Sequence, residues 1–315
     1  MVDYQKIIDR LNALETEQVN PRTVDIDLLP PLEAVRRIND EDKTVAMVVE
    51  RALPEIAAAA ELFAASLRAD GRVFYVGAGT SGRLGVLDAV ECPPTFGTDP
   101  QQIIGLISGG YDTLVMSQEG VEDRRDSAIS DLEQQRLSPG DLVIGLAASR
   151  RTPYTLSALE YAQSIGCKTV FIICNELDQS GTIDPAIDSA SVVISLPVGP
   201  EVITGSTRMK SGTAQKMTLN MISTTAMVIL GKTYGNLMVD LQAKSDKLAA
   251  RSRKLLMDIL AIDLQQADDL LARADGIVKT AILMQRASIN KPTAEAILEK
   301  HSGHLKAALE NGNNK

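Results

Sequence analysis

Between residues 72 and 197, five short apolar runs rich in β-branched residues alternate with longer segments of helical pattern. Parallel strands need long crossover connections, so this alternation indicates a parallel sheet covered by helices on both faces. The expected strands are Arg72–Gly77, Ile103–Gly109, Asp141–Ala147, Lys168–Cys174 and Ser191–Pro197. The expected helices cover residues 82–91, 112–136, 152–165 and a short piece near 185. We therefore predict an α/β fold built on a five-stranded parallel sheet.

Helical segments are predicted on either side of this core. The first 70 residues end in a long alanine-rich helix, and a polar loop after the fifth strand leads into an apolar helix that reaches Gly231. The rest of the chain is again helical in pattern. We expect a helical segment over 1–70 that packs on the core, a sheet domain over 71–240 and a helical subdomain over 241–315.

The first expected strand ends in a glycine turn that opens a helix. Backbone N–H groups and the positive end of the helix therefore lie at the tip of a strand, where they stabilise an anion. Gly77, Gly79 and Gly82 match the dinucleotide pattern G-x-G-x-x-G, but no acidic residue follows about 20 positions on at the tip of a second strand. The hydroxyls of Thr80 and Ser81 inside the turn favour a small phosphorylated ligand instead.

The composition argues against several kinds of partner. The net charge of −9 and the pI near 4.9 disfavour binding to nucleic acid or to an anionic membrane. Aromatic residues make up only 3% of the chain and Trp is absent, which disfavours stacking on single-stranded bases. An anionic ligand must therefore be held by local donors against the field of the whole protein.

The sequence contains neither an apolar signal core nor an uncharged apolar stretch of membrane-spanning length, which predicts a cytoplasmic protein with no membrane partner. The thiols of Cys92, Cys167 and Cys174 and the imidazoles of His301 and His304 fit no familiar metal-site spacing. We expect buried, reduced thiols and neither a metal nor a cofactor.

Three hydroxyl-rich loops are expected at the carboxyl ends of the strands, where open α/β sheets bind ligands. They are residues 79–82, a loop with Ser149 and Thr152 after the third strand, and a loop with Ser206 and Thr207 after the fifth. A single Ser or Thr before a helix is more often a plain N-cap. Three such loops at one edge of the sheet favour a phosphate-bearing ligand.

This arrangement resembles the sugar isomerase (SIS) family of phosphosugar-binding domains and, within it, the N-acetylmuramic acid 6-phosphate etherases over nearly the whole chain. The motifs that carry the resemblance are Asn39–Val45, Gly77–Gly82, Asp88–Gly97, Glu119–Asp123, Thr152–Tyr154, Thr204–Lys216 and Gly235–Asp240. The resemblance implies a flavodoxin-like sheet and a homodimer with active sites at the subunit interface. It also implies cleavage of the D-lactyl ether of the phosphosugar without metal or cofactor.

The resemblance assigns roles to two residues, Glu122 as the base and Glu91 as the acid. From the three loops themselves we expect the substrate-binding residues to be Gly79, Thr80, Ser81, Ser149, Thr152, Ser206 and Thr207. Two carboxylates in opposite protonation states suffice for an elimination followed by hydration.

Read without the resemblance, the two glutamates leave alternatives open. Glu122 is expected in a charged helix with Arg125 and Asp126 one turn on, which also fits a solvated surface carboxylate. Glu91 precedes Cys-Pro-Pro and is expected to end its helix, where the helix dipole disfavours a carboxylate. Nine residues of helix from Gly82 span roughly 13 Å. A solvated surface carboxylate is thus an equal alternative for Glu91. If Glu91 is the implied acid, it acts either after the chain doubles back or in the neighbouring subunit's site.

Other residues also allow two interpretations. Arg208 and Lys210 fit either contacts to the substrate's charge or ion pairs with Glu201 and Asp240. Arg150 stands where the family has glycine, so it either crowds the phosphate or adds a bidentate contact to it.

Two rival functions remain at this stage. The first is a non-catalytic phosphosugar sensor of the glucokinase regulatory type, which would need no acid for lactate. The second is an aldose–ketose isomerase, which would abstract the same proton and release no lactate.

Overall fold

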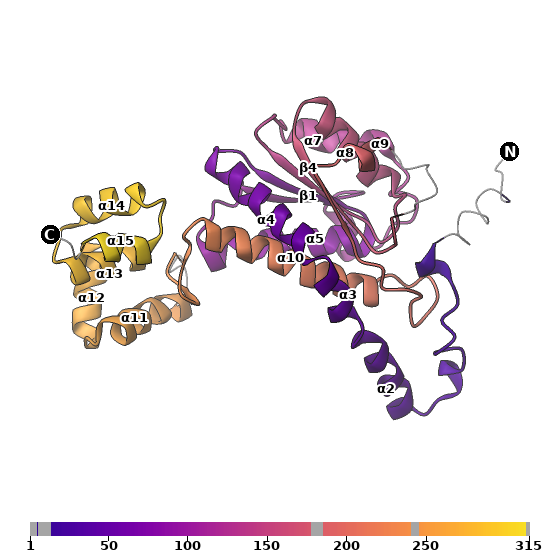
Figure 1. Cartoon of the computed structure of the whole chain (residues 1–315), viewed down its shortest axis with the longest axis horizontal. Coiled ribbons are helices and arrows are strands. Elements are labelled where there is room, and N and C mark those ends of the chain that lie inside the picture. Colours follow the sequence, from indigo (N-terminus) through magenta and orange to yellow (C-terminus); the bar gives the residue numbers. More distant parts are fainter. Residues whose placement is uncertain (1–4, 6–13, 178–184, 241–245, 313–315) are drawn as a thin grey trace. The chain divides into compact units, whose positions relative to one another are not determined.

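The computed structural model describes residue 5 and residues 14–177, 185–240 and 246–312 (Figure 1). Five parallel strands form one sheet in the order β2-β1-β3-β4-β5. They are β1 (Val73–Gly77), β2 (Ile103–Ile107), β3 (Leu142–Leu146), β4 (Lys168–Ile173) and β5 (Val192–Ser195). This is the flavodoxin-like order of doubly wound folds. The predicted α/β fold class and all five predicted strands are confirmed.

The sheet register brings three strand ends level with one another. Gly77 at the end of β1 pairs with Ile107 of β2 on one side and with Leu146 of β3 on the other. The chain leaves β1 toward one edge of the sheet and returns to β3 on the other side of it. Ligands of open α/β sheets bind at such a switch point. The loops after β1 and β3 flank this position.

Helices cover both faces of the sheet. Figure 1 shows α7, α8 and α9 on one face and α4, α5 and α10 on the other. Their bounds are α4 Leu53–Arg68, α5 Gly79–Phe96, α7 Arg125–Gln134, α8 Pro153–Ser164, α9 Pro185–Asp188 and α10 Lys210–Ile229. The buried side chains of Phe74, Val143 and Phe171 pack with those of Tyr154 and Leu159 from α8. Burial on both faces is the reason that these strands read as continuous apolar runs.

The segment ahead of α4 holds short helical pieces. They are η1 (Glu15–Glu17), η2 (Ile26–Leu28), α2 (Pro31–Asp42) and α3 (Val45–Arg51). This segment belongs to the same compact unit as the sheet. It therefore supplies residues to the edge of the sheet where ligands bind.

The prediction of one helix over 112–136 is wrong. Helix α6 covers only Asp112–Val115, and turns follow until α7 begins at Arg125. Gly120 has φ +79°, a left-handed conformation that an α-helix does not accommodate. The Val121 carbonyl instead accepts a 2.6 Å hydrogen bond from the Ser108 hydroxyl. Tertiary contacts thus hold this stretch open as a loop.

Helix α5 is longer than predicted at both ends. It begins at Gly79 and continues through Glu91 and two prolines to Phe96. Proline fixes φ near the helical value, so a last turn with Pro93 and Pro94 is tolerated once it is held by packing. Cys92 and Phe96 are buried and hold that turn. The prediction that the helix ends at Glu91 is therefore wrong.

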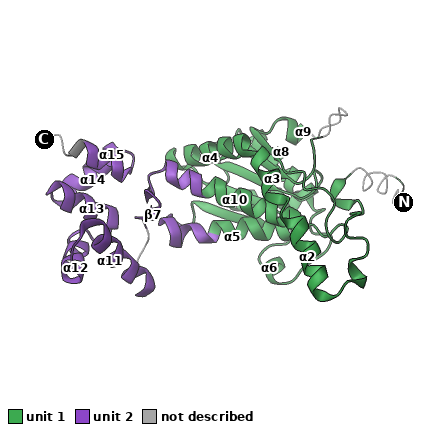
Figure 2. Cartoon of the chain, turned by 60° about the horizontal axis from the view of Figure 1, so that its bottom comes forward, with its two compact units in different colours: residues 1–89, 101–223 green, residues 90–100, 224–315 purple. Residues whose placement is uncertain are grey.

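By its contacts the chain divides into two compact units, residues 1–89 with 101–223 and residues 90–100 with 224–315 (Figure 2). Among its described residues the second unit holds the ends of α5 and α10, a two-stranded antiparallel hairpin and five further helices. The hairpin strands and the further helices are β6 (Thr233–Tyr234), β7 (Leu237–Met238), α11 (Asp246–Leu260), α12 (Leu264–Arg273), α13 (Val278–Ala287), α14 (Lys291–Lys300) and α15 (Leu305–Gly312). The division of the chain into domains at residues 70 and 240 stays a prediction.

Helices α11–α15 share an apolar core. Its fully buried side chains include Leu256, Ile282, Leu283 and Leu305. Within the described part of the chain, no helix is both long enough and apolar enough to cross a membrane.

Candidate active site

A cavity of about 270 Å³ lies at the carboxyl ends of β1, β2 and β3. Residues that directly follow each of these strands line it, such as Ala78, Ser108 and Ala147. Seven of the nine predicted site residues are also in its wall: Gly79, Thr80, Ser81, Glu122, Ser149, Thr152 and Thr207. Ser206 and Glu91 are not among the lining residues. The structure therefore gathers the three predicted loops around one cavity.

The glycine turn places a helix N-terminus at this cavity. Gly77 and Gly82 are in close contact, since a Cβ on Gly82 would come within 2.6 Å of the Gly77 carbonyl oxygen. Gly79 begins α5 with φ +55°. The first N–H groups of a helix have no partner within the helix and carry its positive end. They are suited to bind an anion at the Gly79 end of α5.

Ser81 is tied to helix α10. Its hydroxyl donates a 2.9 Å hydrogen bond to Oε1 of Gln215, and both side chains are buried. A hydroxyl has one proton to donate and two lone pairs. This contact fixes the side chain of Ser81 at the wall of the cavity.

Glu122 lies in the turn before α7 and is half-buried. Its carbonyl oxygen accepts a 2.9 Å hydrogen bond from the backbone N–H of Tyr154 in the first turn of α8. Arg125 is engaged in an ion pair with Glu160. Glu122 and Arg125 are thus not neighbours on one helix, contrary to the prediction. The backbone of this turn holds Glu122 at the cavity wall.

The loop after β3 presents two hydroxyls to the cavity. Thr152 is the N-cap residue of α8, yet its side chain makes no capping hydrogen bond. Pro153 at the first helical position has no N–H that needs a cap. The Ser149 hydroxyl accepts a 3.3 Å hydrogen bond from the N–H of Arg151. The Thr152 hydroxyl is therefore not used as a plain N-cap.

Arg150 is half-buried and is not among the residues that line the cavity. Its charge acts on Glu15 of the N-terminal segment. Burial and the charge of Glu176 raise the pKa of Glu15, and Arg150 partly offsets that rise. The two predicted effects of Arg150 on a bound phosphate, crowding and a bidentate contact, stay predictions.

The loop after β5 is built on buried charge. The Glu201 carboxylate accepts hydrogen bonds from the backbone N–H groups of Lys210 and Ser211 and from the Ser211 hydroxyl. It caps the start of α10 at its positive end. Thr207 in this loop lines the cavity, while Ser206 is half-buried beside it.

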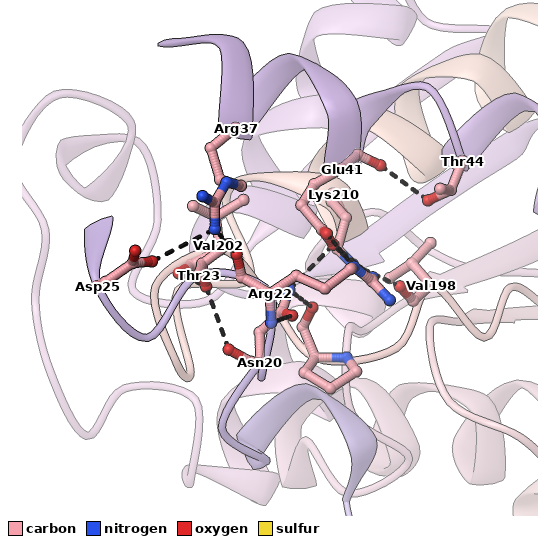
Figure 3. A network of polar contacts seen from close by, with 11 residues as sticks. Asn20, Arg22, Thr23, Asp25, Arg37, Glu41, Thr44, Val198, Val202 and Lys210 are labelled. Atoms are coloured by element: carbon pink, nitrogen blue, oxygen red, sulfur yellow. Dashed lines mark hydrogen bonds and ion pairs between the residues drawn. The ribbon is translucent and has the colours of Figure 1, made fainter. Parts of the chain in front are cut away.

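Lys210 is fully buried in an ion pair, as Figure 3 shows. Its ammonium lies 2.9 Å from Oε2 of Glu41 and 2.8 Å from the Val198 carbonyl oxygen. Arg22 and Asn20 also donate to the Glu41 carboxylate. Neither predicted role of Lys210 is therefore found, because its ammonium is paired with Glu41.

The predicted ionic partner Asp240 is occupied elsewhere. It pairs with Lys232 and Lys279 in the second unit. Arg208 is exposed.

Two lining residues come from a segment that the sequence analysis did not connect with the site. Thr16 and Glu17 of η1 both face the cavity. Nothing in the local pattern of residues 14–20 signals this, because the segment precedes β1 by more than 50 residues. Arg83 also lines the cavity, and its guanidinium donates to the carbonyls of Thr113 and Leu114.

Glu91 lies on an exposed face of α5. Leu87 and Val90 share this face and are 42% and 58% exposed. Residues at i, i+3 and i+4 form one side of a helix. Glu91 thus belongs to a surface strip with apolar neighbours.

Within the described residues, no group of three or more His, Cys, Asp and Glu side chains is arranged to hold a metal ion. The three cysteines are buried and unpaired by disulfides. Burial raises the pKa of the Cys174 thiol to about 12 and that of Cys167 to about 11. These thiols stay protonated and unreactive near neutral pH.

A sheet of this order, with a glycine turn and hydroxyl-rich loops at its carboxyl edge, is compatible with an SIS domain, and a family model identifies one in this chain. Residues 55–163 match the model of the glucokinase regulatory protein N-terminal SIS domain. Among solved structures, phosphoheptose isomerase of Neisseria gonorrhoeae is 16% identical with a TM-score of 0.44, over 64% of this chain and 99% of that chain.

Relatives that match almost the whole chain identify its family within the proteins that contain an SIS domain. The N-acetylmuramic acid 6-phosphate etherase of Erwinia tasmaniensis is 50% identical over 300 residues, which cover 95% of this chain and 96% of that protein. The etherase of Streptomyces coelicolor is 49% identical over 305 residues, 95% of this chain and 94% of that protein. The chain belongs to the family of N-acetylmuramic acid 6-phosphate etherases. The resemblance noted in the sequence is confirmed.

Proposed function

We propose that this chain is a carbon–oxygen lyase that cleaves the D-lactyl ether of N-acetylmuramic acid 6-phosphate. The products are N-acetylglucosamine 6-phosphate and D-lactate. The chain's membership of the etherase family supports the reaction. The observation that carries the proposal is the position of Glu122, whose carboxylate shares one cavity with the helix N-terminus at Gly79 and with the hydroxyls of two further loops.

The phosphate is expected at the N-terminus of α5. The N–H groups of the glycine turn and the hydroxyls of Ser149 and Thr152 would hold it, together with Ser81 once its hydroxyl proton turns from Gln215 to the phosphate. Ser206 and Thr207 would contact the sugar or the phosphate. Local donors of this kind are required because the net charge of the protein opposes an anion.

The reaction is an elimination followed by a hydration. In the open-chain sugar, the aldehyde at carbon 1 makes the hydrogen on carbon 2 acidic, and Glu122 removes it as the base. The bond between carbon 3 and the ether oxygen breaks, and Glu91 protonates that oxygen so that it leaves as the hydroxyl of D-lactate. Water then adds to carbon 3 of the unsaturated aldehyde. Each proton transfer is worth on the order of 10² to 10⁴ in rate.

The two rival functions predict different products. A phosphosugar sensor of the glucokinase regulatory type is not favoured, because that model matches only residues 55–163 while the etherases match 95% of the chain. The decisive experiment is incubation with N-acetylmuramic acid 6-phosphate and assay for D-lactate. Folded protein that binds the sugar but releases no lactate would support a sensor, and a ketose product would support an isomerase.

Phosphate binding can be tested at Ser81. The Ser81→Ala variant should bind N-acetylglucosamine 6-phosphate about tenfold more weakly, since hydrogen bonds to charged groups are worth about 1.5–3 kcal/mol. Isothermal titration calorimetry gives the dissociation constant. Ser164→Ala, at the exposed end of α8, is the control and should leave it unchanged. An unchanged constant in Ser81→Ala would move the phosphate to another part of the cavity.

Glu91 is proposed to act in the neighbouring subunit's site. Helix α5 is unbroken from Gly79 to Phe96, so the chain does not double back before Glu91. The twelve residue steps from Gly79 to Glu91 span about 18 Å at ~1.5 Å per residue, longer than the reach from a hexose phosphate to its carbon 3. The exposed apolar side chains of Leu87 and Val90 on the same face suit a subunit interface. A two-fold homodimer would donate Glu91 reciprocally.

Subunit complementation tests this arrangement. Glu91→Gln and Glu122→Gln homodimers should each be inactive, and a mixed dimer should have one intact site and one site with both lesions. After exchange of subunits at equal concentrations, about a quarter of wild-type activity should return, because half of the dimers are mixed. Exchange is verified by mass spectrometry of differently tagged chains. Activity that stays absent after verified exchange would place Glu91 in its own chain's site.

The metal-free and cofactor-free reaction and the cytoplasmic location remain predictions.

A further inference from the structure

The segment around η1 is held firmly against the ligand-binding edge of the sheet. The N–H of Glu15 donates a 3.0 Å hydrogen bond to Oδ1 of Asn175, which follows β4. Asn175 in turn donates to the Ala148 carbonyl oxygen in the loop after β3. The Thr16 carbonyl oxygen accepts from the N–H of Gly205 in the loop after β5. Residues 15–16 are thus attached directly to the loops after β4 and β5, and through Asn175 to the loop after β3.

A second set of contacts anchors the segment a few residues later. The Asn20 side chain donates to Glu41 and to the Pro200 carbonyl oxygen, and the Thr23 hydroxyl donates to the Val202 carbonyl oxygen (Figure 3). Asn20, Thr23 and Glu41 are all buried. The chain between Thr16 and Asn20 is therefore fixed at both ends, and Glu17 lies between the anchors.

The Glu17 carboxylate faces the cavity and has no partner among the residues that the structure describes. Among the described residues, no hydrogen bond or ion pair engages it, although Glu17 is half-buried. It lies over Gly205, where an added Cβ would be 2.9 Å from Oε2 of Glu17. A carboxylate held on fixed backbone without a protein partner is available to a ligand.

The charges in the cavity decide which part of a ligand Glu17 can meet. Glu119 and Glu122 also line the cavity, and the guanidinium of Arg83 is engaged with backbone carbonyls. An ionised carboxylate only accepts hydrogen bonds, so it repels a phosphate and attracts hydroxyl or amide N–H groups. The phosphate belongs at the N-terminus of α5, and Glu17 therefore faces the sugar.

We propose that Glu17 forms a sugar subsite, in which its carboxylate accepts hydrogen bonds from a hydroxyl or from the acetamido N–H of the bound phosphosugar. This subsite rests on the proposed function, because it uses the same cavity and the same ligand. Glu17 thereby selects the direction of the sugar relative to its phosphate. The anchored segment supplies a specificity-determining residue of the site.

The test compares two ligands on one variant. Glu17→Gln should bind N-acetylglucosamine 6-phosphate about tenfold more weakly, as expected for a lost hydrogen bond to a charged group, and should bind inorganic phosphate as tightly as the wild type or more tightly. In turnover, KM for N-acetylmuramic acid 6-phosphate should rise while kcat changes less. Glu50→Gln, an exposed glutamate of α3, is the matched control and should change neither ligand's affinity.

Three outcomes would overturn the subsite. They are unchanged binding of the sugar phosphate, an equal loss of affinity for both ligands, and a fall in kcat alone, which would indicate proton transfer by Glu17. Thermal unfolding shows whether the Glu17→Gln variant is folded. If it is unstable, Glu17→Asp replaces it, because aspartate keeps the charge but has a shorter side chain. Glu17→Asp should also bind the sugar phosphate more weakly while its affinity for inorganic phosphate is not reduced. Wild-type protein that binds the sugar phosphate but releases no lactate would contradict the proposed function and not the subsite.

Discussion

Replacing Glu122 by Gln is expected to abolish both D-lactate release and exchange of the carbon 2 hydrogen with solvent. Gln keeps the size of the side chain but cannot take a proton, so the proposed first step of the elimination should fail. Loss of a general base costs on the order of 10² to 10⁴ in rate. The measurement is D-lactate release in water and, separately, deuterium incorporation at carbon 2 of the recovered sugar in D₂O.

Glu91→Gln should lose D-lactate release but keep the exchange of the carbon 2 hydrogen, which distinguishes it from Glu122→Gln. It lacks the proposed acid for the leaving oxygen, so lactate release should fall, while Glu122 as the proposed base should still exchange the hydrogen on carbon 2. Glu133→Gln, an exposed glutamate on α7, is the control for both assays. If deuterium enters the sugar with Glu122→Gln and not with Glu91→Gln, the two roles are reversed.

Lys210→Met is expected to lower the free energy of unfolding by about 3 kcal/mol. Removing one partner of a buried ion pair typically costs about 3–5 kcal/mol, because the other charge is left buried. The side chains of Lys210 and Glu41 are 0% and 3% exposed. Arg22, which is 60% exposed, stays as a partner of Glu41 and limits the loss. Urea-induced unfolding followed by circular dichroism measures the change.

Two further variants show whether the buried charge is the cause. Lys43→Met breaks an exposed pair with Asp40 and should cost less than about 1 kcal/mol. The double variant Lys210→Met with Glu41→Leu removes both charges and should be less destabilised than Lys210→Met alone. If Lys43→Met and Lys210→Met lowered the free energy of unfolding equally, burial of the Lys210 charge would not be the cause of the destabilisation.

The same pair gives the stability a defined pH dependence. Hydrogen bonds from Arg22 and then from Lys210 and Asn20, against the effect of burial, lower the pKa of Glu41 from 4.5 to about 2. A lowered folded-state pKa means that the stabilisation is complete above pH 4.5 and is lost as the pH falls toward 2. The shift corresponds to on the order of 3 kcal/mol. In the Lys210→Met variant, the fall in the free energy of unfolding should begin at a higher pH.

The strands and the site loops were predictable because each has a recognisable local sequence pattern. A buried parallel strand appears in the sequence as a β-branched run, and β1 at Val73–Gly77 ends in glycine and follows Gly71 by two residues. The rule that ligands bind at the carboxyl ends of such strands then brings together the loops with Ser81, Ser149 and Thr207. The cavity wall contains all three.

The turn that carries Glu122 was predicted wrongly because its residues favour a helix. The run from Glu122 to Asp126 is rich in charged residues typical of an exposed helix. What decides its structure is the left-handed Gly120 together with hydrogen bonds from Ser108 and Tyr154, which lie far away in the sequence. Such tertiary contacts routinely override local propensity.

The sheet, its strands, the glycine turn and the family are recognisable in the amino-acid sequence, because each depends on a pattern along the chain. Only the packed structure reveals that Glu17 faces the cavity, that Lys210 is buried against Glu41 rather than turned to the ligand, and that the strip around Glu91 is exposed. The contact between Lys210 and Glu41 joins residues 169 positions apart. No local sequence pattern predicts such a long-range contact, because it forms only when the packed sheet and its helices bring distant segments of the chain together.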